Sequence, residues 1–216
     1  MINFYSSLEQ DGFVVMETSE SEFLLLAKEL GTPIPSRKHS DLIDLLQPKQ
    51  KEQAHKASLS NIYGETEFPY HTDGAYFTIP PKYICLRYLK GISKPTSTKI
   101  LPILNYLKPL EKECLFREFY FVRGRHFSFY TSILEKRIDK GDFFIRFDPG
   151  CMRSRNHSTY FEDLITEKIA FKNLVEIEWY EGKTIIINNW KTLHSRPHVQ
   201  AEELNYRTLQ RIMINE

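Results

Sequence analysis

The apolar positions of this chain recur mainly as short runs of the kind that form β-strands. These runs are rich in Ile, Val, Tyr and Phe, and Pro, Gly or charged turns separate them. They lie at 12–16, 83–89, 115–122, 143–147, 175–179, 184–187 and 208–214. Because only two helices are predicted beside them, the pattern favours a mainly β fold, a sandwich or jelly roll with a few flanking α-helices.

The first predicted helix has a clear beginning and end. Ser19 and Glu22 fit a capping box, with Ser19 at the N-cap and Glu22 at the third helical position. Gly31, followed closely by two prolines, predicts the end of this helix. The charged, Gln-rich segment 35–56 that follows is predicted to be a surface excursion or part of a lid. A second helix is predicted from about Tyr160 to Lys172.

Length and charge limit the classes of function. The 216 residues predict a single domain, 1–216, that is long enough to bury a core and a pocket. The net charge is +1 and the basic residues are spread along the chain, whereas a nucleic-acid partner requires a concentrated basic face. The composition therefore indicates a small-molecule partner and no nucleic acid.

Cysteine usage and the N-terminal segment point to the cytoplasm. The three cysteines are far apart and form no CxxC motif, which predicts reduced, buried thiols rather than disulfides or a zinc knuckle. The longest apolar runs are far shorter than the ~20 residues that span a bilayer, and no basic leader precedes them. We expect a cytoplasmic protein without a membrane partner.

A histidine and an aspartate two residues apart form the first candidate metal site. This spacing occurs twice, at His39–Asp41 and at His71–Asp73. Asp41 lies in a polar segment, where a turn or helix cap explains it. If residues 68–77 are extended, the side chains of His71 and Asp73 point to the same side, ~6.6 Å apart at Cα, and can converge on one ion.

His194 supplies a third candidate ligand. It follows the apolar strand predicted at 184–187, so it is expected near the core. Two neutral imidazoles and one carboxylate leave three positions of an octahedron open, as in non-heme Fe(II) oxygenases. A structural zinc site would instead use four closed ligands, commonly with Cys. Taken alone, His194 is better explained as an ordinary core or loop histidine, and only its combination with the other candidates favours a ligand.

Two arginines in the last predicted strand are candidates for anion binding. Arg207 and Arg211 are four residues apart, so on a strand they share one face with Leu209. An arginine on the inner face of a sandwich needs an anionic partner, and its guanidinium fits a carboxylate with two hydrogen bonds. The alternative is a surface edge strand with two solvated arginines.

In combination these segments resemble one family. HTDGAYF, the strand YICLRYLK, NNWKTLHSRP and RTLQR resemble the TauD/clavaminate-synthase-like family of Fe(II)- and 2-oxoglutarate-dependent oxygenases. The resemblance covers nearly the whole chain and implies a double-stranded β-helix (jelly roll). The asparagine pair, His-x-Arg and Arg-x-x-x-Arg look most like the amino-acid-hydroxylating branch.

The resemblance assigns roles to individual residues. His71, Asp73 and His194 match the catalytic iron ligands, and Arg207 matches the arginine that binds the distal carboxylate of the cosubstrate 2-oxoglutarate. The implied reaction consumes 2-oxoglutarate and O₂, releases succinate and CO₂, and hydroxylates a small polar substrate such as an amino acid or derivative. The intact Asp73 implies oxygenation rather than halogenation, while desaturation and cyclisation stay open.

The resemblance also assigns roles to Thr98 and Arg211, and for the hydroxyl it leaves alternatives open. Thr98 lies about where the family has a hydroxyl that assists the arginine, but KPTSTKI replaces the usual Gly-Gly-x-Thr, so Thr96 and Ser97 remain alternatives. Arg211 matches a second arginine that touches the cosubstrate or an anionic substrate group.

Arg146 and Asp148 match positions near a strand that lines the substrate pocket in relatives. A turn built on Asp-Pro-Gly also explains Asp148 without any ligand.

Two functions from other classes remain open from sequence. The first is a non-catalytic jelly-roll module that binds an anionic small molecule and needs no iron. The second is a metal-dependent hydrolase or isomerase with a metal-activated water. Such barrels usually have closely spaced histidines in a Gly-rich frame, whereas this chain has 9 glycines and a distant third ligand.

Overall fold

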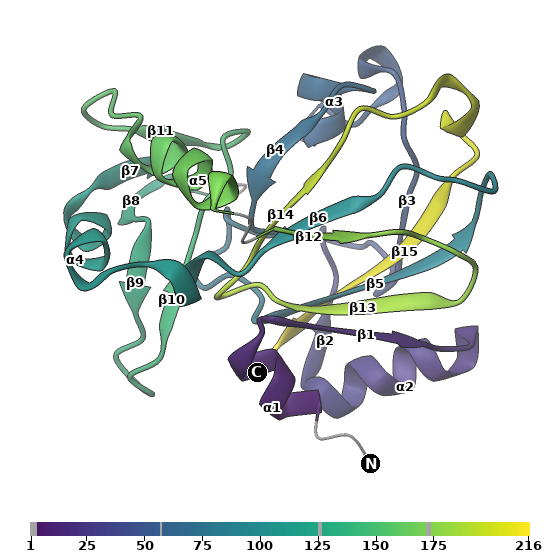
Figure 1. The fold of residues 1–216 in the computed structure, drawn as a ribbon, viewed down its shortest axis with the longest axis horizontal. Helices are drawn as coiled ribbons and strands as arrows, with labels where there is room; N and C mark the ends of the chain where they lie inside the picture. Colours follow the sequence, from purple (N-terminus) through teal and green to yellow (C-terminus); the bar gives the residue numbers. More distant parts are fainter. Residues whose placement is uncertain (1–3, 57, 125–126, 172–173) are drawn as a thin grey trace.

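Two antiparallel sheets form the centre of the molecule (Figure 1). The computed structural model describes residues 4–56, 58–124, 127–171 and 174–216. In the larger sheet the order is β1 (Phe13–Glu17), β13 (Lys183–Asn188), β5 (Tyr83–Lys90), β15 (Thr208–Asn215) and β2 (Thr32–Ile34), with β3 (Asp44–Leu46) also on β15. In the smaller sheet the order is β12 (Val175–Ile177), β6 (Thr98–Leu101), β14 (Leu193–Arg196) and β4 (Phe68–His71). The predicted mainly β jelly roll is confirmed.

The central strands of the larger sheet bury both faces. Along β5, Ile84 and Leu86 join the cluster between the two sheets, whereas Cys85 joins a cluster with two helices on the opposite face. These helices are α1 (Phe4–Gln10) and α2 (Glu20–Leu30), which lie along the outer side of the sheet in Figure 1. Burial on both faces explains the uninterrupted apolar runs at 83–86 in β5 and 185–187 in β13.

The capping box predicted at the start of α2 is present. The backbone N–H of Ser19 donates to Glu22 Oε2 at 2.7 Å, and the N–H of Glu22 donates to Ser19 Oγ at 3.3 Å. The helix ends at Leu30, directly before Gly31, as predicted. A Cβ at residue 31 would collide with the carbonyl oxygen of Asn215 at the end of β15, so glycine is required for this close approach.

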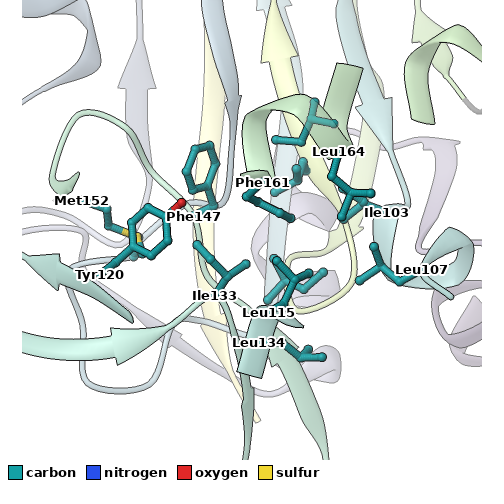
Figure 2. Close-up of a cluster of buried hydrophobic side chains, with 14 of the residues drawn as sticks. Ile103, Leu107, Leu115, Tyr120, Ile133, Leu134, Phe147, Met152, Phe161 and Leu164 are labelled. Carbon is teal, nitrogen blue, oxygen red and sulfur yellow. The ribbon is translucent and has the colours of Figure 1, made fainter. Parts of the chain in front are cut away.

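A second group of elements lies beside the sheets, at the left of Figure 1. It comprises α4 (Pro109–Arg117), β7 (Phe119–Val122), β8 (Phe129–Ser132), β9 (Leu134–Lys136), β10 (Phe143–Ile145), β11 (Met152–Ser154) and α5 (Tyr160–Ala170). Their apolar side chains, with Leu115, Ile133 and Phe161 among them, form the buried cluster drawn in Figure 2. Shorter elements are η1 (Lys51–Gln53), α3 (Leu59–Tyr63), η2 (Ile103–Tyr106) and η3 (Ala201–Glu203).

Several predicted boundaries are wrong. The strand expected at 115–122 begins only at Phe119, because residues up to Arg117 form the last turns of α4. Leu115 is buried in the Figure 2 cluster as part of that helix. The second predicted helix ends at Ala170, and the rest of its predicted span includes Lys172, which lies outside the described residues.

The cysteines are free thiols, as predicted, but they are not all buried. Cys85 is buried, Cys151 is half-buried and Cys114 is exposed on α4. No helix within the described ranges has both the length and the apolar character needed to cross a membrane.

Candidate metal centre

The pairing of β4 with β14 brings the two candidate histidines together. His71 is the last residue of β4, and His194 is its Cα partner on β14. Directly opposed residues of antiparallel strands have adjacent side chains on one face. The two imidazole rings are accordingly 4.4 Å apart between centroids, and both residues are buried.

Asp73 reaches the histidines from a turn rather than from a strand. β4 ends at His71, so the extended segment considered for 68–77 stops before Asp73. Two hydrogen bonds hold the intervening residue, since Thr72 N–H donates to the Phe147 carbonyl at 2.7 Å and Phe147 N–H donates to Thr72 Oγ1 at 3.1 Å. The turn therefore has a fixed position against the neighbouring segment.

The Asn189 side chain holds the backbone of Asp73. Its Oδ1 accepts from Asp73 N–H at 2.9 Å, and its Nδ2 donates to the carbonyls of Asp73 and Pro81, each at 2.9 Å. Gly74 then turns the chain at φ +70°, a conformation that favours glycine. Sequence reasoning gave Asn189 no role of its own, although the asparagine pair before His194 is a visible signal.

We expect Asn189→Ala to destabilise the protein by about 2 kcal/mol, because it leaves buried groups of the Asp73 turn without partners. Urea unfolding followed by circular dichroism measures this change. Asn105→Ala is the matched control, since Asn105 is exposed and donates one hydrogen bond, to the Gln10 carbonyl. Equal stability of both variants would contradict the role given to Asn189.

The three side chains present atoms that can share one ion. One ligand atom from each of His71, Asp73 and His194 lies within 4.8 Å of the others. His71 Nδ1 is 2.9 Å from the Pro69 carbonyl, an acceptor that holds the ring so that Nε2 is the nitrogen available to a metal. His194 Nε2 is 3.8 Å from Asp73 Oδ2.

The protonation states suit a divalent cation. Burial, with the neighbouring His71, lowers the pKa of His194 to about 3, so its imidazole is neutral. Burial alone would raise the pKa of Asp73, but Arg211 and the two histidines lower it below its usual value. Two imidazoles and one carboxylate form a donor set that fits Fe(II) and related first-row ions.

The three residues border a cavity of about 310 Å³, which is large enough for a small ligand. Arg207 borders the same cavity and is only 3% exposed. Its Nη2 donates to the Thr96 carbonyl at 3.0 Å, and its Nε lies 3.3 Å from Glu203 Oε2. Burial lowers the pKa of Arg207, and the charge of Glu203 opposes this effect.

Of the three hydroxyl residues considered, Thr98 alone borders the cavity. Its Oγ1 accepts a hydrogen bond from Trp179 Nε1 at 3.0 Å. Thr96 instead donates to Glu203, and Ser97 donates to Glu176 on the outer side. Thr98 is therefore the best placed of these hydroxyls to meet a ligand beside Arg207.

Arg196 adds a second guanidinium to this end of the cavity, and sequence reasoning gave it no binding role. Its guanidinium carbon lies 3.6 Å from the centre of the Phe68 ring, and Nη2 donates to the carbonyls of Gly64 and Thr66. Burial and the nearby charge of Arg207 lower the pKa of Arg196 to about 10.

Arg211 borders the cavity but is already paired with two carboxylates of this chain. Nη1 donates to Asp73 Oδ1 at 2.8 Å, while Nη2 and Nε donate to Asp44 Oδ2 at 2.8 and 3.2 Å. Burial alone would lower the pKa of Arg211, but the two carboxylates raise it. The resemblance implied contact with a cosubstrate or substrate anion, and the structure gives Arg211 internal partners instead.

The last two predicted site residues, Arg146 and Asp148, lie in different places relative to the cavity. Arg146 is fully buried outside the cavity, where it donates to Glu135 and to three backbone carbonyls of residues 75–78. It holds that turn and does not border the cavity at which a substrate role was expected for it. Asp148 does border the cavity. Its Oδ1 accepts from Gly150 N–H at 2.7 Å, and burial raises its pKa.

Comparisons with known proteins give structural matches only. No family model matches the sequence, and no curated protein matches it. The non-heme iron oxygenase OrfP, in complex with Fe, succinate and (3S)-hydroxy-L-Arg, aligns with a TM-score of 0.71 at 15% identity, over 99% of this chain and 80% of that chain.

Two other solved structures resemble this chain to a similar degree. Asparagine oxygenase with Fe(II), 2S,3S-3-hydroxyasparagine and succinate aligns with a TM-score of 0.71 at 15% identity, over 97% of this chain and 77% of that one. PvcB of Pseudomonas aeruginosa aligns with a TM-score of 0.67 at 14% identity, over 99% of this chain and 79% of that one. At these identities the matches establish that this chain has the fold of these oxygenases.

Proposed function

We propose that this protein is an Fe(II)- and 2-oxoglutarate-dependent oxygenase of the TauD/clavaminate-synthase-like kind. One observation carries the proposal: His71, Asp73 and His194 bring three ligand atoms within 4.8 Å of one another at the wall of a cavity. A non-catalytic anion-binding module would have no use for this donor set. The matching fold of OrfP, solved with Fe and alpha-ketoglutaric acid, supports the same proposal.

In this proposal His71, Asp73 and His194 hold the iron. When bound, iron with 2-oxoglutarate and O₂ supplies the oxidising chemistry: one oxygen atom enters the substrate as a hydroxyl, the other enters succinate, and CO₂ leaves. The residues of this chain bind and orient the reactants. Their burial keeps water away from the reacting atoms and strengthens each charged contact.

Arg207 is the proposed partner of the distal carboxylate of 2-oxoglutarate. A buried guanidinium that borders a cavity binds a carboxylate with charge-assisted hydrogen bonds. The Thr98 hydroxyl is proposed to assist at the same end of the cavity, and the charge of Arg196 adds to the attraction for an anion.

Asp148 is the proposed recognition group for a positively charged substrate. Its carboxylate is half-buried at the cavity wall, and a cationic partner would stabilise its charged form there. An amino acid with a second cationic group would supply one. OrfP has been solved with a hydroxylated arginine, which is consistent with this substrate class.

Succinate formation from 2-oxoglutarate tests this substrate class. We expect faster turnover with L-arginine than with its uncharged isostere L-citrulline, and we expect Asp148→Asn to reduce this preference by about tenfold, which corresponds to ~1.4 kcal/mol. Asp11→Asn is the matched control, because Asp11 is exposed and does not border the cavity. An unchanged preference in Asp148→Asn would exclude Asp148 as the recognition group. Turnover independent of 2-oxoglutarate would favour a hydrolase or isomerase.

A further inference from the structure

A second carboxylate, Asp44, stands behind the candidate metal ligand Asp73. Arg211 joins the two, with its Nη1 2.8 Å from Asp73 Oδ1 and its Nη2 2.8 Å from Asp44 Oδ2. The three side chains are largely buried, at 11%, 17% and 16% exposure for Asp73, Asp44 and Arg211. Asp44 is not one of the expected iron ligands. Its position behind Arg211, in line with Asp73, therefore requires an explanation.

Strand pairing fixes the position of Asp44. β3 pairs with β15, and Asp44 is the Cα partner of Arg211, so the two side chains lie directly opposite each other. Ser36 Oγ donates to Asp44 Oδ1 at 2.7 Å, while Asp44 Oδ2 accepts from Arg211. Both oxygens of Asp44 therefore have partners, and the guanidinium of Arg211 is held from behind.

We propose that Asp44 and Arg211 are positioning residues for the metal ligand Asp73. Arg211 holds Asp73 through Oδ1, which leaves Oδ2, 3.8 Å from His194 Nε2, as the single oxygen that faces the site. Partners of this kind orient a ligating carboxylate and commonly determine metal affinity. This inference rests on the proposed function for the presence of the metal, and on the contacts for the roles of the two residues.

Charge explains why Arg211 needs Asp44. A lone guanidinium beside a metal ligand would repel a divalent cation and offset the charge of Asp73. With Asp44 included, the two carboxylates and one guanidinium together retain a net negative charge beside the two imidazoles. The carboxylate from β3 thus permits an arginine to orient Asp73 without removing the attraction for the cation.

The same contacts bear on the substrate. Each of the three guanidinium nitrogens of Arg211 already donates to a carboxylate of the chain. Asp44 takes the place that a substrate anion would occupy on this guanidinium. Arg211 therefore serves the metal ligand, and the substrate is recognised by other groups of the cavity.

Anaerobic titration of the metal-free protein with Co(II), followed by its visible d–d absorption, tests the inference. Three variants are compared with wild type: Asp44→Asn, Arg211→Lys and Asp41→Asn. Arg211→Lys keeps the charge but replaces the planar fork by a single ammonium that cannot hold both carboxylates in the same geometry. Asp41→Asn is the control, because it removes the same charge from an exposed position in the same segment.

We expect Asp44→Asn and Arg211→Lys to weaken Co(II) binding by about tenfold. We also expect both to change the d–d spectrum at saturating metal, because a released Asp73 carboxylate can bind through both oxygens. Asp41→Asn should match wild type in both measurements. Circular dichroism establishes that each variant is folded, and if Asp44→Asn does not fold, Arg211→Lys decides by the same two measurements.

The outcomes separate this inference from the proposed function. Co(II) affinity and a spectrum equal to wild type in Asp44→Asn would overturn the positioning role while leaving the metal site intact. A second outcome would also overturn the positioning role: weakened Co(II) binding in Asp44→Asn, with normal binding and a normal spectrum in Arg211→Lys. In that case only the charge of Asp44, and not the geometry of the Arg211 guanidinium, would affect the metal. Absence of metal binding by the wild type would overturn both proposals.

Discussion

Arg207→Ala is expected to weaken binding of 2-oxoglutarate by about 2–5 kcal/mol, which is about 30-fold to several thousand-fold in the dissociation constant. Arg207 is 3% exposed and borders the cavity, so the proposed carboxylate partner would be left buried without its counter-charge. Isothermal titration of the Co(II)-loaded protein with 2-oxoglutarate measures the effect without turnover.

The matched control for this prediction is Arg123→Ala, since Arg123 is exposed and does not border the cavity. Removing Arg207 also leaves the fully buried Glu203 without its ion-pair partner, so the variant must be shown to be folded at the temperature of titration. Equal affinity for 2-oxoglutarate in wild type and Arg207→Ala would place the carboxylate partner elsewhere. Arg196 would then be the first candidate, because it is the other guanidinium at that end of the cavity.

Asp73→Ala is expected to weaken Fe(II) and Co(II) binding by more than the roughly 10–100-fold typical of partners outside the ligand set. Asp73 is the only carboxylate of the three-residue cluster, so its loss leaves two imidazoles beside the positive charge of Arg211. Dialysis against a defined free metal concentration, followed by metal analysis, measures the occupancy.

A second carboxylate that borders the same cavity, Asp148, provides the comparison for this variant. Asp148→Asn removes a half-buried charge from the cavity wall but leaves the three candidate ligands in place. We expect it to retain most of the bound metal. Full metal occupancy of Asp73→Ala at the same free metal concentration would remove Asp73 from the ligand set.

Local and periodic signals in the sequence predicted much of the fold. The capping box at Ser19, the stop at Gly31 and the strands β5, β13 and β15 all follow from neighbouring residues and from alternation along the chain. The strand expected at 115–122 is wrong because its apolar residues include Leu115, which is buried on one face of α4. A short apolar run has the same composition in either case, and tertiary packing decides between helix and strand.

Only those residues of the candidate site that belong to a recognisable sequence motif could be predicted. His71, Asp73 and His194 were chosen by spacing and by resemblance, and they lie together in space. Asn189 and Asp44 were not chosen, because their roles depend on contacts with residues more than one hundred positions away in the chain.

Two of the predicted arginines, Arg146 and Arg211, have internal partners that the sequence did not indicate. Sequence shows that a buried arginine needs partners but does not show which ones it finds. Arg146 finds backbone carbonyls and Glu135, and Arg211 finds Asp44 and Asp73. Neither choice can be deduced from the position of the arginine on its own strand or turn.

Anaerobic absorbance titration of the metal-free protein with Fe(II) and 2-oxoglutarate tests most directly whether this is an iron- and 2-oxoglutarate-dependent oxygenase. Chelation of Fe(II) by the keto acid produces a visible metal-to-ligand charge-transfer band. We predict this band in the wild type, its absence in Asp73→Ala, and a requirement for more 2-oxoglutarate in Arg207→Ala. A folded wild-type protein that gives no band at saturating Fe(II) and 2-oxoglutarate would contradict the proposed function.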